Sequence, residues 1–96
     1  MIAIPKAILF PLGQLAITPG ALTAIRDTGR FAIDYIARHF RGDWGDVCPD
    51  DWEANDTALV DGTRLLSAYE LSSGVVIWVI TEADRSSTCI LLPVEH

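Results

Sequence analysis

The last third of the chain constrains the fold most, because three β-rich runs follow one another with only short polar breaks between them. The runs cover residues 64–71, 75–81 and 87–92, and the breaks are residues 72–74 and 82–86. Branched and aromatic runs bounded in this way are typical of a three-stranded antiparallel meander. The middle run is apolar at almost every position, which indicates a strand that is covered on both faces.

One further strand and three helices are predicted in the first two thirds of the chain. Pro11 and Gly13 would interrupt a central strand, so residues 13–17 favour a short strand at a sheet edge. Helix-start signals, apolar spacing and closing glycines predict helices over residues 18–29, 30–40 and 49–61. The sequence therefore predicts a single α+β domain, residues 1–96. Its helices are expected to pack on one face of an antiparallel sheet of three or four strands.

The predicted core consists of the apolar side chains on the inner faces of these elements. In the second helix, Ile33, Ile36 and Phe40 lie on one stripe with i, i+3, i+7 spacing. In the middle strand, Ile77 and Val79 share one face because side chains alternate along a strand. The predicted core is Leu22, Ile25, Ile33, Ile36, Phe40, Trp44, Leu59, Leu66, Ile77, Val79, Ile90 and Leu92.

The acidity of the chain limits what it can bind. A formal net charge of −6 argues against non-specific binding to nucleic acid, whose phosphates would repel the surface. A local basic patch stays open as an alternative if the arginines at 38, 41, 64 and 85 converge. The acidic surface is explained either by attraction of a basic protein partner or by solubility alone.

No cofactor, metal site or membrane segment is expected. Cys48 and Cys89 are too isolated for a metal site or a disulfide framework, and each is expected to be buried or half-buried in a reducing cytoplasm. No positive charge precedes the apolar N-terminal residues, so no signal peptide is expected. Pro5, Lys6 and Pro11 interrupt a run that is also too short to span a membrane. The oligomeric state is not predicted.

Two basic residues close the second helix and can be interpreted in two ways. Arg38 and His39 fall in the last turn, where positive charge favours the negative end of the helix dipole. The functional interpretation makes His39 a catalytic acid or base, since its ordinary pKa suits proton transfer near neutrality.

The stretch between the second and third helices also carries polar candidates. Trp44 is expected to fill the junction between helices and sheet, while Asp43 and Asp46 cap backbone amides. The inner face of the third helix is expected to carry Trp52, Asn55 and Leu59. For Asn55 a structural hydrogen bond to a nearby loop is favoured over contact with a substrate.

The turn at residues 82–86 is more highly charged than a tight hairpin requires. It holds Glu82, Asp84 and Arg85, and the guanidinium needs acceptors wherever it lies. Arg85 is therefore predicted to point inward and to bind a carboxylate that joins this turn to the 42–46 loop.

Several of these stretches together resemble a known family. They are Phe10–Gly13, Thr18–Leu22, Arg38–His39, Gly42–Asp46, Asn55, Arg64–Tyr69 and Trp78–Thr88. Over residues 8–96 the chain resembles a family of similarly short bacterial proteins of plasmids and integrated mobile elements, labelled hypothetical or plasmid-related, some with a restriction-endonuclease subunit label. The resemblance implies a mobile-element setting and no particular activity. The chain departs from the pattern at Cys89, where threonine is usual, and at His96, where tyrosine is usual.

The predicted architecture is also similar to that of the barnase, EndoU, colicin and RelE group of small ribonucleases. This likeness implies a metal-independent, phosphodiester-processing enzyme in which His39 acts as acid or base and Arg38 and Arg85 hold phosphate. The residues expected to align the scissile group are Ser67, Tyr69 and Thr88.

The preferred hypothesis is a small cytoplasmic accessory protein of mobile elements that binds a host or element-encoded protein. Its role would be defence, counter-defence or plasmid maintenance, and the net charge of −6 supports it. The candidate binding residues are Arg38, Asp43, Trp44, Asn55, Glu82, Asp84 and Arg85.

Overall fold

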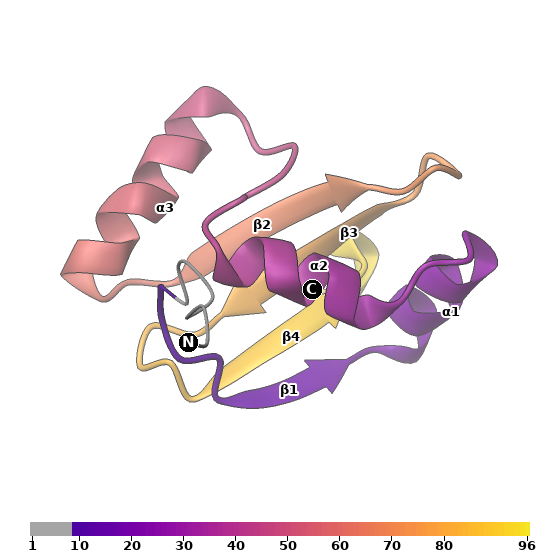
Figure 1. Ribbon diagram of the computed structural model, residues 1–96, viewed down its shortest axis with the longest axis horizontal. Helices are drawn as coiled ribbons and strands as arrows, with labels where there is room; N and C mark the ends of the chain where they lie inside the picture. The colour runs from indigo at the N-terminus through magenta and orange to yellow at the C-terminus, as the bar shows by residue number, and fades with distance from the viewer. Residues whose placement is uncertain (1–8) are drawn as a thin grey trace, which may run out of the picture.

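The computed structural model describes residues 9–96 as a four-stranded sheet with α1 and α2 packed over one face (Figure 1). In chain order the elements are β1 (Gln14–Ile17), α1 (Pro19–Asp27), α2 (Ala32–Phe40), α3 (Pro49–Asp61), β2 (Leu65–Glu70), β3 (Val76–Thr81), β4 (Ser87–Leu91) and the 3-10 helix η1 (Pro93–Glu95). The predicted α+β class is confirmed, and each predicted helix and strand is present. Residues 1–8, which carry the expectation of no signal peptide, lie outside the described part.

The sheet is mixed, whereas a purely antiparallel one was predicted. Its strand order is β1-β4-β3-β2. The β2–β3 and β3–β4 pairs are antiparallel, as expected for a meander, but β1 runs parallel to β4. A meander predicts direction only for strands joined by short turns; the direction of β1 depends on contacts with residues distant in sequence. Two such contacts are the N–H groups of Gln14 and Thr18, which donate to the carbonyls of Ser86 and Ile90, each at 3.0 Å.

The helix ends follow local signals in the sequence. The Thr18 hydroxyl accepts from the Ala21 N–H at 3.2 Å, and Pro19 occupies the first turn of α1, where no N–H is needed. Pro49 begins α3 in the same way, and Gly62 ends it in the left-handed conformation at φ 74°. These bounds agree with the prediction because they depend only on neighbouring residues.

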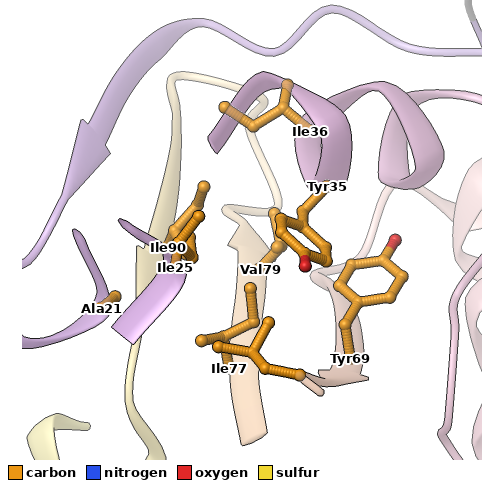
Figure 2. Packing of buried hydrophobic residues seen from close by; sticks show 9 residues of the cluster. Ala21, Ile25, Tyr35, Ile36, Tyr69, Ile77, Val79 and Ile90 are labelled. Atoms are coloured by element: carbon orange, nitrogen blue, oxygen red, sulfur yellow. The ribbon is translucent and has the colours of Figure 1, made fainter. Parts of the chain in front are cut away.

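The main core lies between the sheet and the first two helices. Figure 2 shows Ile77, Val79 and Ile90 of the sheet facing Ile25 and Ile36 of the helices. A second cluster lies beside α3 and consists of Phe10, Trp44, Ala58 and Leu65. Trp44 has no exposed surface and fills the junction as predicted. The predicted core residues Phe40, Leu59 and Leu92 are only partly buried and pack against these clusters.

The buried stripe of α2 differs from the predicted one. Tyr35, Ile36 and His39 are buried, while Ile33 is 61 % exposed. The i, i+3, i+4, i+7 stripe therefore begins at Ala32 and not at Ile33. The helix is turned this way because the polar His39 has hydrogen-bond partners inside the sheet.

Other positions of the predicted core are also wrong. In α1, Ala21 is buried and Leu22 is 38 % exposed. In β2, the inward face carries Leu65 and not Leu66, because Ser67 and Tyr69 share the face that α2 covers. Trp52 and Cys48 were also predicted to be at least partly buried, but both are exposed.

Ile36 and Ile33 offer a matched test of the orientation of α2. Ile36→Ala should lower the free energy of unfolding by about 2–5 kcal/mol, because the deleted atoms leave a cavity in the core. Ile33→Ala, with the same chemistry on the same helix, should cost less than about 0.5 kcal/mol. Urea unfolding followed by circular dichroism measures both values. Equal losses at the two positions would contradict the observed orientation.

Candidate functional site

Three of the five catalytic candidates meet in one buried hydrogen-bonded chain. His39 Nδ1 lies 2.5 Å from Ser67 Oγ, and His39 Nε2 lies 2.9 Å from Thr81 Oγ1. Thr81 Oγ1 lies 2.7 Å from Thr88 Oγ1, which donates to the Leu12 carbonyl at 2.8 Å. Each of the four side chains is at most 1 % exposed. The chain thus joins α2 to β2, β3, β4 and the segment before β1.

The direction of these hydrogen bonds defines the histidine tautomer. A carbonyl can only accept, so the one hydroxyl proton of Thr88 is used on Leu12. Thr88 must then accept from Thr81, and Thr81 must accept from His39 Nε2–H. The remaining ring nitrogen, Nδ1, accepts from the Ser67 hydroxyl. Every donor and acceptor atom in the ring is therefore engaged, with His39 neutral.

Burial lowers the pKa of His39 to about 4, and the positive charge of Arg85 adds to this effect. Aromatic rings pack against the imidazole: the centroids of Phe10 and Trp44 lie 5.3 and 5.5 Å from that of His39, both edge-on. The imidazole has no exposed surface from which to exchange a proton with a substrate. This arrangement is that of a structural histidine.

Thr81 belongs to the hydrogen-bonded chain, although the sequence did not indicate it as a candidate site residue. The alternation that directs Ile77 and Val79 inward also directs Thr81 inward, so the signal was present in the sequence. What the sequence lacked was any indication that Thr81 lies opposite Thr88 in the β3–β4 register.

Tyr69 lies next to the histidine chain, on the same face of β2 as Ser67. Its hydroxyl donates to the Asp43 carbonyl at 2.6 Å, and the Arg38 guanidinium lies 4.5 Å from its ring centroid. Tyr69 has no exposed surface, and burial raises the pKa of its phenol above the ordinary value. Tyr69 therefore anchors the 42–46 loop to the sheet.

Arg38 pairs with Asp43, with Nε 2.8 Å from Oδ2. The hydrogen bond from Arg38 lowers the pKa of Asp43, and the same bond raises the pKa of Arg38. Asp43 also accepts from the Gly45 N–H at 3.1 Å, and Asp46 accepts from the Glu70 N–H at 2.8 Å. Asp43 thus caps a neighbouring amide as predicted, whereas the amide that Asp46 caps lies in β2, distant in sequence.

The predicted acceptors of Arg85 are wrong. Its guanidinium donates to backbone carbonyls, at 2.6 Å to Thr63 and 3.1 Å to Ala58, and no carboxylate binds it within residues 9–96. It also donates to Glu82 O at 3.1 Å within its own turn. Arg85 therefore joins the 82–86 turn to the end of α3 and not to the 42–46 loop. The Ala58 carbonyl also accepts from the Gly62 N–H at 2.9 Å, so Arg85 uses its second lone pair, at the end of α3 where the helix dipole is negative.

Asn55 and Trp44 belong to the structure of the β2 edge. The Asn55 amide donates to Leu66 O at 2.7 Å and accepts from Leu66 N–H at 3.1 Å. Two residues further along β2, the Trp44 carbonyl accepts from Ala68 N–H at 3.1 Å, and Asp46 N–H donates to Ala68 O at 2.6 Å. Asn55 thus makes structural hydrogen bonds, but its partner lies in a strand and not in the predicted loop.

Glu82 and Asp84 are exposed and line an open hollow of about 440 Å³ together with Ala83 and Ser86. Asp84 accepts from the Ser86 N–H at 2.9 Å, and hydrogen bonds from Ser86 lower the pKa of its carboxyl. In residues 9–96, no three His, Cys, Asp or Glu side chains are grouped as metal ligands. None of the helices described is both long and apolar enough to cross a membrane.

Among the described helices, α3 carries the most acidic residues. The helix has five acidic residues and no basic one. Only Asn55 and Ala58 are buried, while Val60 is 87 % exposed and Trp52 is 36 % exposed. Figure 1 shows the helix standing beyond β2, away from α1 and α2.

Neither a family model, nor a curated protein, nor a solved structure matches this chain.

His39 should make stability depend on pH in a defined window. The unfolded histidine binds a proton below its ordinary pKa of 6.5, whereas the folded one does so only near 4. Stability should therefore fall as the pH is lowered from 6.5 toward 4, by about 3 kcal/mol in total. Urea unfolding at several pH values measures this slope. His39→Gln should remove most of it, whereas His96→Gln, at the other histidine, should leave it unchanged; a wild-type curve that is flat in this window would contradict the assignment.

Arg85 has a positive φ of 61°, the one such non-glycine residue in the described chain. Both Arg85→Ala and Arg85→Gly lose the hydrogen bonds of the guanidinium. Only Arg85→Gly also relieves the backbone strain, because glycine adopts positive φ without a steric penalty. The glycine variant should therefore be the more stable of the two by about 1 kcal/mol. Thermal and urea unfolding compare them. As a control, Ala83→Gly in the same turn, at negative φ, should destabilise the protein; an Arg85→Ala variant at least as stable as Arg85→Gly would contradict the argument.

Proposed function

We propose that this protein acts by binding another protein, and that its α3 helix presents an acidic face to a basic surface of that partner. The observation that carries the proposal is the concentration of five acidic and no basic residues on a helix with only Asn55 and Ala58 buried. Charge on an exposed face steers a complementary partner and selects it against others.

Helix stability accounts for only some of these carboxylates. Asp50 and Asp51 lie in the first turn, where negative charge favours the helix dipole. Asp56 accepts from the Trp44 indole N–H at 3.0 Å. Asp61 lies in the last turn, where the dipole disfavours it, and Glu53 has no hydrogen bond in the described structure. Glu53 and Asp61 are therefore the residues best explained by an external partner.

The alternative of a ribonuclease-like enzyme needs an acid or base that a substrate can reach. His39, Ser67 and Thr88 are buried in one closed hydrogen-bonded chain, and the Tyr69 hydroxyl is used on the Asp43 carbonyl. Arg85 is occupied by carbonyls at the end of α3. These contacts favour binding over phosphodiester chemistry.

The proposed partner is a host protein or one encoded by a mobile element. This part of the proposal rests on the resemblance to plasmid-related bacterial proteins. The proposed role is defence, counter-defence or plasmid maintenance, in the cytoplasm.

Capture of partners from a lysate of the bacterial host tests the proposal. The wild-type protein should retain a reproducible partner with a basic surface at physiological salt, and added salt should release it. Glu53→Gln/Asp61→Asn, which removes two charges without disturbing a hydrogen bond of the fold, should weaken binding by about tenfold. Titration calorimetry with the purified partner measures the loss.

A matched control removes the same charge elsewhere. Asp27→Asn/Glu70→Gln changes two exposed carboxylates, one in α1 and one in β2, and should bind like the wild type. An equal loss of affinity in both double variants would show that net charge, and not the α3 face, determines binding. The lack of any reproducible partner would overturn the proposal.

A further inference from the structure

The two edges of the sheet differ in how their backbone groups are satisfied. At the β2 edge, the outward groups of Leu66 and Ala68 are bonded by the Asn55 amide and by the backbone of the 44–46 loop. Within residues 9–96, no segment pairs with the outer side of β1. Among residues 9–96, one edge is therefore closed to a further strand and the other is open.

The open edge presents a defined set of donors and acceptors. The N–H groups of Gln14 and Thr18 point toward β4, where they donate to carbonyls. Backbone groups alternate in direction along a strand, so Ala16 also faces β4. Leu15 and Ile17 consequently direct their N–H and C=O groups away from the sheet.

The chain segment that forms this edge is rich in apolar residues, and the nearest charge that the structure shows is the Glu95 carboxylate, which accepts from the Thr18 hydroxyl. Leu15 is 52 % exposed, and Phe31, at the start of α2, is 72 % exposed. A groove of about 220 Å³ beside the edge is lined by Leu15, Ala16, Ile17, Ala32, Ile36 and Ile90. No Asp, Glu, Lys or Arg occurs from Leu9 to Ile25. The edge thus lacks the lysines that commonly protect an exposed strand from pairing.

We propose that β1 pairs antiparallel with β1 of a second copy of this chain, about a two-fold axis at Ala16. In this register Leu15 of each copy lies opposite Ile17 of the other, and each such pair exchanges both of its outward hydrogen bonds. Ala16 faces Ala16 across the axis at a non-hydrogen-bonded position, where the two Cα atoms approach most closely. The two sheets become one, with the helical layers of both copies on the same side.

Three observations favour a second copy as the occupant. The outward groups of β1 are self-complementary about Ala16, so an identical strand satisfies all of them. A chain with net charge −6 repels its own copies, and β1 lies in a stretch, residues 9–25, that adds no charge to this repulsion. Because the β2 edge is closed, pairing ends at a dimer and does not continue into a fibre.

A disulfide cross-link tests the register directly. The full chain is first freed of its own thiols by Cys48→Ser and Cys89→Thr. Ala16→Cys in this background should form a covalent dimer under mild oxidation, because two residues facing each other at a non-hydrogen-bonded position lie within disulfide reach. Gln14→Cys, two residues from the axis, should not cross-link beyond the level of random collision.

Sedimentation equilibrium tests the interface without cysteines. The wild-type protein should sediment as a dimer, and Leu15→Lys should raise its dissociation constant at least about tenfold, because it places charge on the pairing edge. Val60→Lys adds the same charge on the exposed face of α3 and should leave the dimer intact. Circular dichroism verifies that both variants remain folded.

A wild-type protein that stays monomeric up to its solubility limit would overturn the proposal, even if an extended apolar peptide binds to the edge. A dimer that Leu15→Lys leaves unchanged, or equal cross-linking through Gln14→Cys and Ala16→Cys, would also overturn it by placing the interface elsewhere. None of these three results bears on partner binding by α3, which is measured separately.

Discussion

The hydrogen-bonded chain through His39 is the interaction on which the rest of the structure depends. It connects α2 to three strands and to Leu12, and it buries four polar side chains with every group paired. Removing one member would leave a buried donor or acceptor unsatisfied, which costs more than the bond itself contributes. The orientation of α2 follows from it: with His39 turned inward, Tyr35 and Ile36 also face the core, and Phe31 and Ile33 remain on the surface.

The region around α3 is held differently. Asn55 and the 44–46 loop close the β2 edge, and Arg85 ties the β3–β4 turn to the C-terminal end of the helix. Few apolar side chains of α3 are buried, so these polar contacts account for much of its attachment. A helix attached in this way leaves its acidic face free, which is the feature that the proposed function uses.

The two proposed interaction surfaces lie at opposite ends of the sheet. The strand order places β1 at one edge and β2, with α3 beside it, at the other. Pairing through β1 would therefore leave both acidic helices of a dimer exposed on the outside. Two weak contacts with a repetitive or dimeric partner would then reinforce each other, because the second binds at a high effective concentration.

The sequence by itself determined where α1 begins and where α3 begins and ends, because Thr18-Pro19, Pro49 and Gly62 act on the backbone within a single turn. Alternation likewise indicated that Ser67 and Tyr69 share a face. Only the tertiary structure decided which face was inward, which way β1 runs, and which acceptors Arg85 reaches. Those outcomes depend on pairs such as His39–Thr81 and Arg85–Ala58, whose members are far apart in sequence and carry no local signal of each other. A polar residue on a helix is buried when a distant strand supplies its partner, and that condition is met only once the chain has folded.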